Sequence, residues 1–116
     1  MRHEIKKVCR IVDELTTIFL GEDTNEVDFK IITSPEKTII RMVDYHTNYS
    51  EAFIDHFRKT LNNQRQSEIE EYYWQLAGET DDDDELTLIG AMVDTATVEK
   101  RDGNLYIEIV RLNVKY

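Results

Sequence analysis

The chain has little of what marks secreted, membrane-spanning or disulfide-rich proteins. Its 116 residues include one cysteine, one proline and four glycines. A single cysteine, Cys9, cannot form an intrachain disulfide, so we expect a reducing compartment and a buried thiol that packs as a small apolar group. No apolar run approaches membrane-spanning length, and residues 1–4 begin a mixed-charge helix rather than a signal peptide. These absences predict a cytoplasmic protein without a membrane partner.

Positive charge is also scarce. The chain has 14 Lys and Arg against 24 Asp and Glu, a formal net charge of −10. Binding to nucleic acid depends on cationic contacts to phosphates, so the composition argues against a nucleic-acid partner. Residues 81–85 contribute five consecutive acids, and removing them from −10 still leaves −5. The acidity is therefore both general and local, and it favours solubility and basic partners.

Hydrophobic periodicity predicts the elements in the order helix, strand, strand, helix, helix, helix, strand, strand. Hydrophobic residues make up 41% of the chain, which is normal for a globular domain with one core. The expected helices cover residues 4–20, a segment capped at 48–51 and ending at 61, 67–78 and 86–93. The expected strands cover residues 27–33, 38–45, 95–100 and 105–114.

Local signals fix several element ends. Asn48 is expected to cap the second helix, with Glu51 completing a capping box. Asp102 and Gly103 form a turn signal between the last two strands. If both strand pairs are hairpins of one sheet, one set of side chains should be mostly buried: Phe29, Ile31, Ile40, Val98, Ile107 and Ile109.

These elements predict a single α+β domain over residues 1–116. The helices must cover one face of the sheet to bury their apolar stripes. We therefore expect a two-layer α/β sandwich, with a mixed sheet of about four strands in two hairpins and helices on one face.

Residues 86–94, followed by a strand, a glycine-containing turn and a final strand, resemble the helix and hairpin that close the anti-sigma-factor serine kinases. Glu14 lies on a helix that resembles the one carrying that family's first nucleotide motif. Asp44 ends the second strand, where the family has its adenine-binding aspartate. The resemblance implies a histidine-kinase-type (GHKL-like) ATPase fold over nearly the whole chain. It makes Glu14 and Asp44 the cofactor-binding residues if nucleotide binding is retained.

The nucleotide motifs of that family are degenerate here. Ile18 stands where a magnesium-binding asparagine would follow Glu14, and its side chain has no oxygen for a hard cation. Residues 44–48 lack the glycines of the family's Asp-x-Gly-x-Gly pattern. The acids at 81–85 replace the second glycine-rich box and would repel a triphosphate, and residues 104–105 lack the threonine usual after the hairpin glycine. Together these departures argue against ATP binding, so no cofactor and no catalytic residues are predicted; the sequence leaves enzyme activity undecided and weighs against it.

Each candidate residue also has a simpler interpretation. Asp44 is also typical of a strand-end cap or turn. The histidines His46 and His56 lack metal-site spacing and are expected on the surface. The acidic run lacks the spacing of a calcium loop and fits a helix cap or a solvated loop. Residues 72–74, Tyr-Tyr-Trp, fit either core packing or a protein interface, where Trp and Tyr are enriched.

The leading hypothesis is a non-catalytic regulatory or scaffolding domain in bacterial signalling that binds another protein. Its partner is expected to be a basic surface or a second copy, and its interaction residues are Trp74, Asp81, Asp82, Asp83 and Asp84. The alternative is a divergent ATP-dependent serine/threonine protein kinase of the anti-sigma-factor type that uses Glu14 and Asp44. A third hypothesis is an unrelated two-layer α/β module with the same element order.

Overall fold

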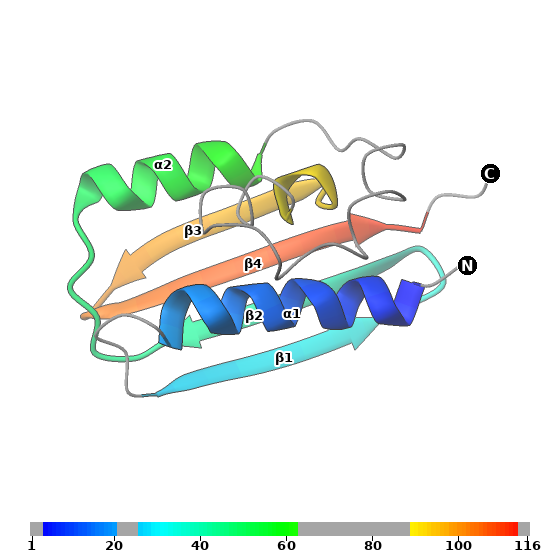
Figure 1. The fold of residues 1–116 in the computed structure, drawn as a ribbon, viewed down its shortest axis with the longest axis horizontal. Coiled ribbons are helices and arrows are strands. Elements are labelled where there is room, and N and C mark those ends of the chain that lie inside the picture. The colour runs from blue at the N-terminus through cyan, green and yellow to red at the C-terminus, as the bar shows by residue number, and fades with distance from the viewer. Residues whose placement is uncertain (1–3, 21–25, 63–88, 114–116) are drawn as a thin grey trace.

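The computed structural model describes residues 4–20, 26–62 and 89–113. Its elements, in chain order, are α1 (Glu4–Leu20), β1 (Val27–Thr33), β2 (Lys37–Asp44), α2 (Glu51–Leu61), β3 (Thr95–Arg101) and β4 (Asn104–Leu112) (Figure 1). The helix predicted over 67–78 lies outside the described residues. Of the helix predicted over 86–93, residues 89–93 are described; residues 89–91 are helical, and residues 92–93 are not.

The four strands form one sheet in the order β1-β2-β4-β3, and every neighbouring pair is antiparallel. The expectation of a mixed sheet is therefore wrong. The reason is the position of the second hairpin: β4, rather than β3, lies beside β2. Since β3 runs in the same direction as β2, its hairpin partner β4 runs against both of them.

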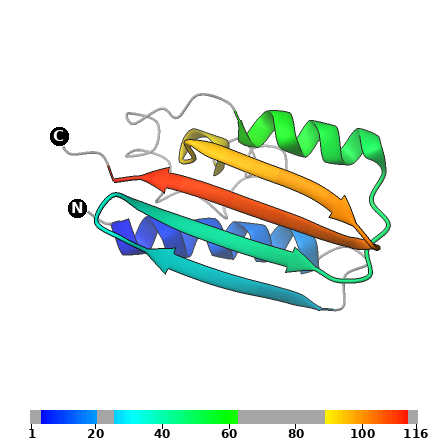
Figure 2. The ribbon, with the colours of Figure 1, turned by 180° about the vertical axis from the view of Figure 1, so that it is seen from behind.

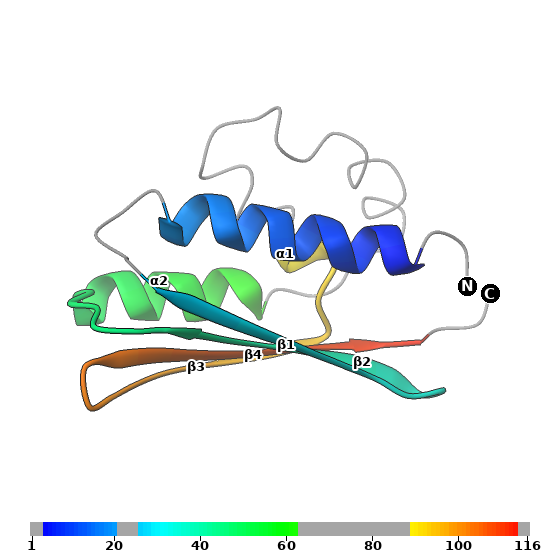
Figure 3. The same cartoon turned by 90° about the horizontal axis from the view of Figure 1, so that it is seen from below.

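The described helices lie on one face of the sheet, which confirms the predicted two-layer α+β arrangement. Figure 3 shows α1 and α2 on the same side of the strands, and Figure 2 shows the opposite face of the sheet with no described element over it. The core lies between the two layers and includes Leu15, Phe19, Ile40, Ile54, Phe57, Leu105 and Ile109.

The buried stripe of α1 differs from the predicted one at its N-terminal end. Ile5, expected in the apolar stripe, is 78% exposed. Cys9 is exposed rather than buried, because it shares the outward surface of the helix with Lys6 and Asp13. The stripe that packs on the sheet is made by Val8, Ile11, Leu15 and Phe19.

The predicted sheet core is confirmed on β2, β3 and β4 and fails on β1. Four of its members are buried: Ile40, Val98, Ile107 and Ile109. Phe29 is only half-buried, and Ile31 is 48% exposed. Both lie on the edge strand β1. The other edge strand, β3, holds the buried Val98 and is contacted by Arg58 of α2 and by its C-cap Asn62.

One helix cap differs from its prediction, and one turn agrees. The N-cap of α2 is Ser50, whose hydroxyl accepts a hydrogen bond from the Phe53 amide at 3.1 Å, rather than Asn48. Between β3 and β4, Asp102 and Gly103 have φ values of 53° and 79°. Positive φ at both central residues is the backbone of a type I′ hairpin turn, which confirms the turn predicted from Asp-Gly.

Candidate functional site

The predicted site residues are divided between buried and undescribed positions. Trp74 and the acidic residues Asp81, Asp82, Asp83 and Asp84 lie outside the described residues, so their role stays a prediction. Glu14 is buried on α1, and Asp44 is buried at the end of β2. His46 and His56 are exposed, as expected of surface histidines.

Asp44 lies where three parts of the fold meet. In the sheet Asp44 pairs with Val27 of β1 and Leu105 of β4, and Asp44 is 0% exposed to solvent. Its Oδ2 accepts a hydrogen bond from the Tyr49 hydroxyl at 3.3 Å. The Tyr49 ring in turn packs edge-on against Phe19, with ring centroids 5.7 Å apart. The last turn of α1, the end of β2 and the segment before α2 are therefore joined at this carboxylate.

Aromatic rings fill the space beside this junction. Tyr49 stacks on Phe53 with centroids 4.7 Å apart, and Phe19 lies 5.2 Å from Phe57. Such pairs add stability beyond the area that they bury. The surroundings of Asp44 are therefore packed with the protein's own side chains.

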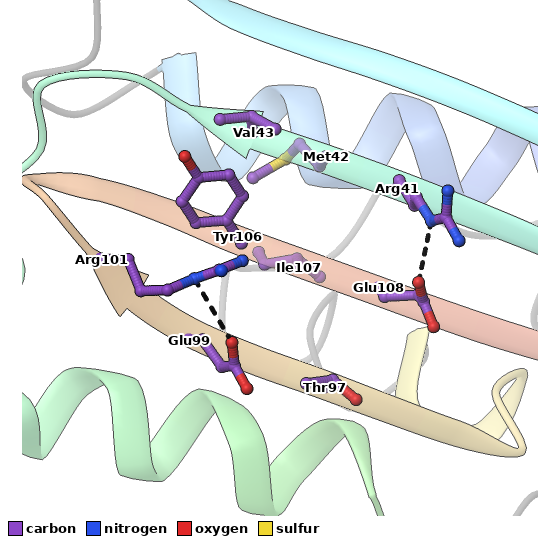
Figure 4. Close-up of a pocket in the computed structure, with 9 residues that line it drawn as sticks. All are labelled: Arg41, Met42, Val43, Thr97, Glu99, Arg101, Tyr106, Ile107 and Glu108. Atoms are coloured by element: carbon purple, nitrogen blue, oxygen red, sulfur yellow. Dashed lines mark hydrogen bonds and ion pairs between the residues drawn. The ribbon is translucent and has the colours of Figure 1, made fainter.

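The opposite face of the sheet carries an exposed groove of about 260 Å³. It lies over β2, β4 and β3, and Figure 4 shows its lining: Arg41, Met42, Val43, Thr97, Glu99, Arg101, Tyr106, Ile107 and Glu108. Residues alternate between the two faces of a strand. The core residues Met42 and Ile107 are buried under the helices, whereas Arg41, Tyr106 and Glu108 stand on the open face.

Two arginine clusters stand over this groove (Figure 4). Arg41 Nε is 2.8 Å from Glu108 Oε2, and their side chains are 47% and 41% exposed. Arg101 Nε is 3.5 Å from Glu99 Oε2, and the Arg101 guanidinium lies 4.4 Å from the centre of the Tyr106 ring. Exposed ion pairs of this kind contribute little to stability. Their arginines can instead exchange these partners for carboxylates or aromatic rings of another molecule.

On the open face, Tyr45, the residue that follows β2, contacts β1. The Tyr45 hydroxyl donates a hydrogen bond to Asp28 Oδ2 at 2.8 Å. That hydrogen bond is the main reason why the pKa of Tyr45 is raised above its ordinary value, with smaller contributions from partial burial and nearby negative charge. The polar groups of β1 and β2 are thus linked at this end of the sheet.

Residues 4–20, 26–62 and 89–113 contain no group of three or more His, Cys, Asp or Glu placed to hold a metal ion. No helix in this part of the chain has the length and apolar character needed to cross a bilayer.

Sequence reasoning did not identify Arg41, Arg101, Tyr106 or Glu108. The sequence signal that could have identified them is the alternation of polar and apolar residues along the strands. Arg41, Tyr106 and Glu108 each have neighbours in the chain that face the core, so their own side chains must lie on the open face. The pairing of Arg41 with Glu108, however, depends on β4 lying beside β2 in a defined register. These residues are 67 positions apart in the chain.

Comparisons with known proteins give no further assignment. No protein-family model matches the chain, and no curated protein or solved structure matches it significantly. The functional interpretation therefore rests on the chemistry of the sites described above.

Proposed function

We propose that this chain is a non-catalytic protein-interaction domain with a regulatory or scaffolding role in bacterial signalling. In this proposal the fold is a degenerate histidine-kinase-type (GHKL-like) ATPase fold, because the element order and the motif positions of the chain resemble those of that family. The observation that carries the proposal is the state of Asp44, which is fully buried and hydrogen-bonded to Tyr49. The signalling context comes from the resemblance to anti-sigma-factor kinases.

The environment of Asp44 argues against a nucleotide. An aspartate that recognises adenine must offer its carboxylate to the amino group of the base. Here the carboxylate has no solvent exposure, and the Tyr49 hydroxyl occupies one of its oxygens. An incoming base would have to displace Tyr49, which also packs on Phe19 and Phe53. That displacement would break aromatic contacts within the core, so the proposed domain holds no nucleotide and catalyses no phosphoryl transfer.

The open face supports binding to a protein. Arg and Tyr are enriched among the residues that dominate binding energy at protein interfaces. The groove presents Arg101 against the Tyr106 ring and Arg41 beside Glu108. A partner that inserts an acidic or aromatic side chain between the two arginines would gain charge-assisted hydrogen bonds and stacking. The acidic segment at 81–84 and Trp74 would extend the interaction to a basic partner.

The nucleotide part of the proposal is tested by thermal denaturation. A ligand that binds only the folded state raises the melting temperature with its concentration. We expect no saturable rise with ATP or ADP, with or without magnesium, up to about 5 mM. A saturable rise that disappears in Asp44→Asn would instead support the divergent ATP-dependent kinase. The variant Tyr49→Phe, which removes only the hydroxyl over Asp44, shows whether that hydrogen bond excludes the base.

The interaction part is tested by charge reversal on the open face. Partners captured from a bacterial lysate by the unaltered protein should be lost with Arg41→Glu and Arg101→Glu, because both guanidinium groups are replaced by acids. Arg10→Glu makes the same charge change on the exposed side of α1 and serves as the matched control. Equal loss with all three variants would show a nonspecific charge effect, and no loss would contradict the groove as the interface.

A further inference from the structure

The two edges of the sheet differ in how their backbone groups are satisfied. On β3, Asn62 donates a hydrogen bond to the Ala96 carbonyl and accepts one from the Ala96 amide, both at 2.9 Å. Arg58 donates to the Val98 carbonyl at 2.6 Å. Asn62 thus makes the pair of hydrogen bonds that a residue of a neighbouring strand would make. The β3 edge is therefore covered at Ala96 and Val98 by side chains from α2 and its C-cap residue.

The β1 edge has no such cover among the described residues. The Tyr45 amide donates to the Glu26 carbonyl at 3.0 Å, and the Ser34 amide donates to the Lys37 carbonyl at 2.9 Å. Even-numbered residues of β1 therefore direct their backbone groups toward β2, and odd-numbered residues direct theirs outward. The outward groups belong to Val27, Phe29, Ile31 and Thr33. Figures 1 and 2 both show β1 at the outer margin of the sheet.

We propose that β1 pairs antiparallel with β1 of a second copy of this chain, with Phe29 opposite Phe29 across a two-fold axis. In this register Phe29 exchanges both backbone hydrogen bonds with its counterpart, and Val27 does the same with Ile31 of the second copy. All of these residues have outward-pointing backbone groups, so the pairing satisfies the geometry of an antiparallel ladder. The two sheets become one continuous sheet.

Charge complementarity selects the second copy as the occupant. In the Phe29-centred register, Asp28 lies directly opposite Lys30 of the second copy, and symmetry repeats this pair. Both side chains stand on the open face at a non-hydrogen-bonded pair, where opposing side chains are closest. Within one chain, Lys30 is opposite Arg41, which is already paired with Glu108. An acid across the edge therefore places an opposite charge directly opposite Lys30, where its own sheet places Arg41.

The neighbouring registers lack this match. Shifting one strand by two residues centres the pair on Asp28 or on Lys30, which places two aspartates or two lysines directly opposite each other. Shifting it by four residues centres the pair on Val27, which places Glu26 against Asp28, another like-charge contact. Centring it on Ile31 places Lys30 against Ile32, which leaves the charge without a partner. Lysines on edge strands usually prevent unwanted pairing. Here Lys30 disfavours the other registers and, with Asp28, permits one.

Apolar burial adds to this pairing. Ile31 is 48% exposed, and Phe29 and Val27 are half-buried on the helix face of β1. Opposing Ile31 with Val27 of the second copy covers apolar surface that the single chain leaves in water. This edge contact uses neither Asp44 nor the arginine groove, so it is independent of the proposed function.

Sedimentation equilibrium of the full chain tests the contact. We expect a reversible monomer–dimer equilibrium between about 1 µM and about 1 mM. Asp28→Lys and Lys30→Asp each replace both attractive pairs by like-charge pairs and should raise the dimer Kd at least about tenfold. The double variant Asp28→Lys/Lys30→Asp restores opposite charges and should return the Kd to within about threefold of the unaltered chain. Glu99→Lys, a charge reversal on β3, should leave the Kd unchanged.

Hydrogen exchange identifies the strand and guards against variants that fail to fold. The amides of Val27, Phe29 and Ile31 should become protected as the dimer forms, and lose that protection in either single variant. Their even-numbered neighbours should stay protected, because they bond to β2. A chain that remains monomeric to about 1 mM, or single variants that dimerise like the unaltered chain, would overturn the proposal.

Discussion

The clearest energetic prediction concerns a buried ion pair that ties α1 to the sheet. Arg111, near the end of β4, is 0% exposed. Its Nε and Nη2 donate to the two carboxylate oxygens of Glu4 at 2.9 and 2.7 Å, and Nη1 donates to the Met92 carbonyl. Glu4→Ala removes the carboxylate. Of the three hydrogen bonds just described, the buried Arg111 guanidinium then keeps the one to the Met92 carbonyl. We expect a large loss of stability.

The size of the loss follows from burial. Breaking a buried ion pair by removing one partner costs about 3–5 kcal/mol. The Glu4 side chain is 13% exposed, so water can enter the vacated position and partly solvate Arg111. We therefore expect the lower end, about 3 kcal/mol. An unfolding entropy of about 2.1 cal/mol/K per residue gives about 0.24 kcal/mol/K for 116 residues, so the melting temperature should fall by about 12 °C.

The assay is thermal unfolding followed by circular dichroism, with two comparison variants. Glu51→Ala removes an exposed acid from the first turn of α2 and should cost only the helix-end effect, below about 1 kcal/mol. The double variant Glu4→Leu/Arg111→Met replaces the pair by apolar side chains and should recover most of the loss. If Glu4→Ala lowered the melting temperature no more than Glu51→Ala, the burial argument would be refuted.

Two further predictions follow from close contacts described by the structure. Gly90→Ala should destabilise the fold by about 1–3 kcal/mol in thermal unfolding, because an added Cβ would lie 2.4 Å from the Thr60 backbone oxygen; an unchanged melting temperature would contradict this packing. Tyr45 should titrate above its ordinary pKa in a tyrosinate absorbance titration, and Asp28→Asn should lower that pKa, because the hydrogen bond to Asp28 favours the neutral phenol. Since the folded pKa is raised, this contribution to stability is present below about pH 10 and is lost as the pH rises through the folded pKa; an unchanged pKa in Asp28→Asn would contradict it.

The sequence predicts the elements well where periodicity and turn chemistry agree. The bounds of α1 and β1 agree with prediction because each has a clear apolar period, and Asp102-Gly103 admits a specific hairpin turn. Errors arise where tertiary context decides. Cys9 has apolar neighbours in the chain but lies on the outer side of the helix, and Ile31 has the alternation of a core residue but lies on an edge strand.

The candidate sites were harder to predict than the fold. Alternation along β4 places Arg111 on the same face as the core residues Ile107 and Ile109, but a positive charge among apolar residues gives no indication of its partner, Glu4. Residues 107 positions apart in the chain meet only after the sheet and α1 pack. The burial of Asp44 likewise depends on Tyr49, whose hydroxyl reaches it only in the packed fold.

The hydrogen bonds of Asn62 to β3 also determine how large an assembly can become. A sheet whose two margins both accept strands can add copies without limit and grow into a fibre. Within the described residues, Asn62 and Arg58 already occupy backbone groups of Ala96 and Val98 on one margin, and the proposed strand addition uses the other margin, β1. Two copies joined at β1 use both of their β1 margins, and growth along the sheet ends there. Removing the side chains of both Asn62 and Arg58 would uncover that margin of β3, and a protein that stops at two copies would become able to polymerise.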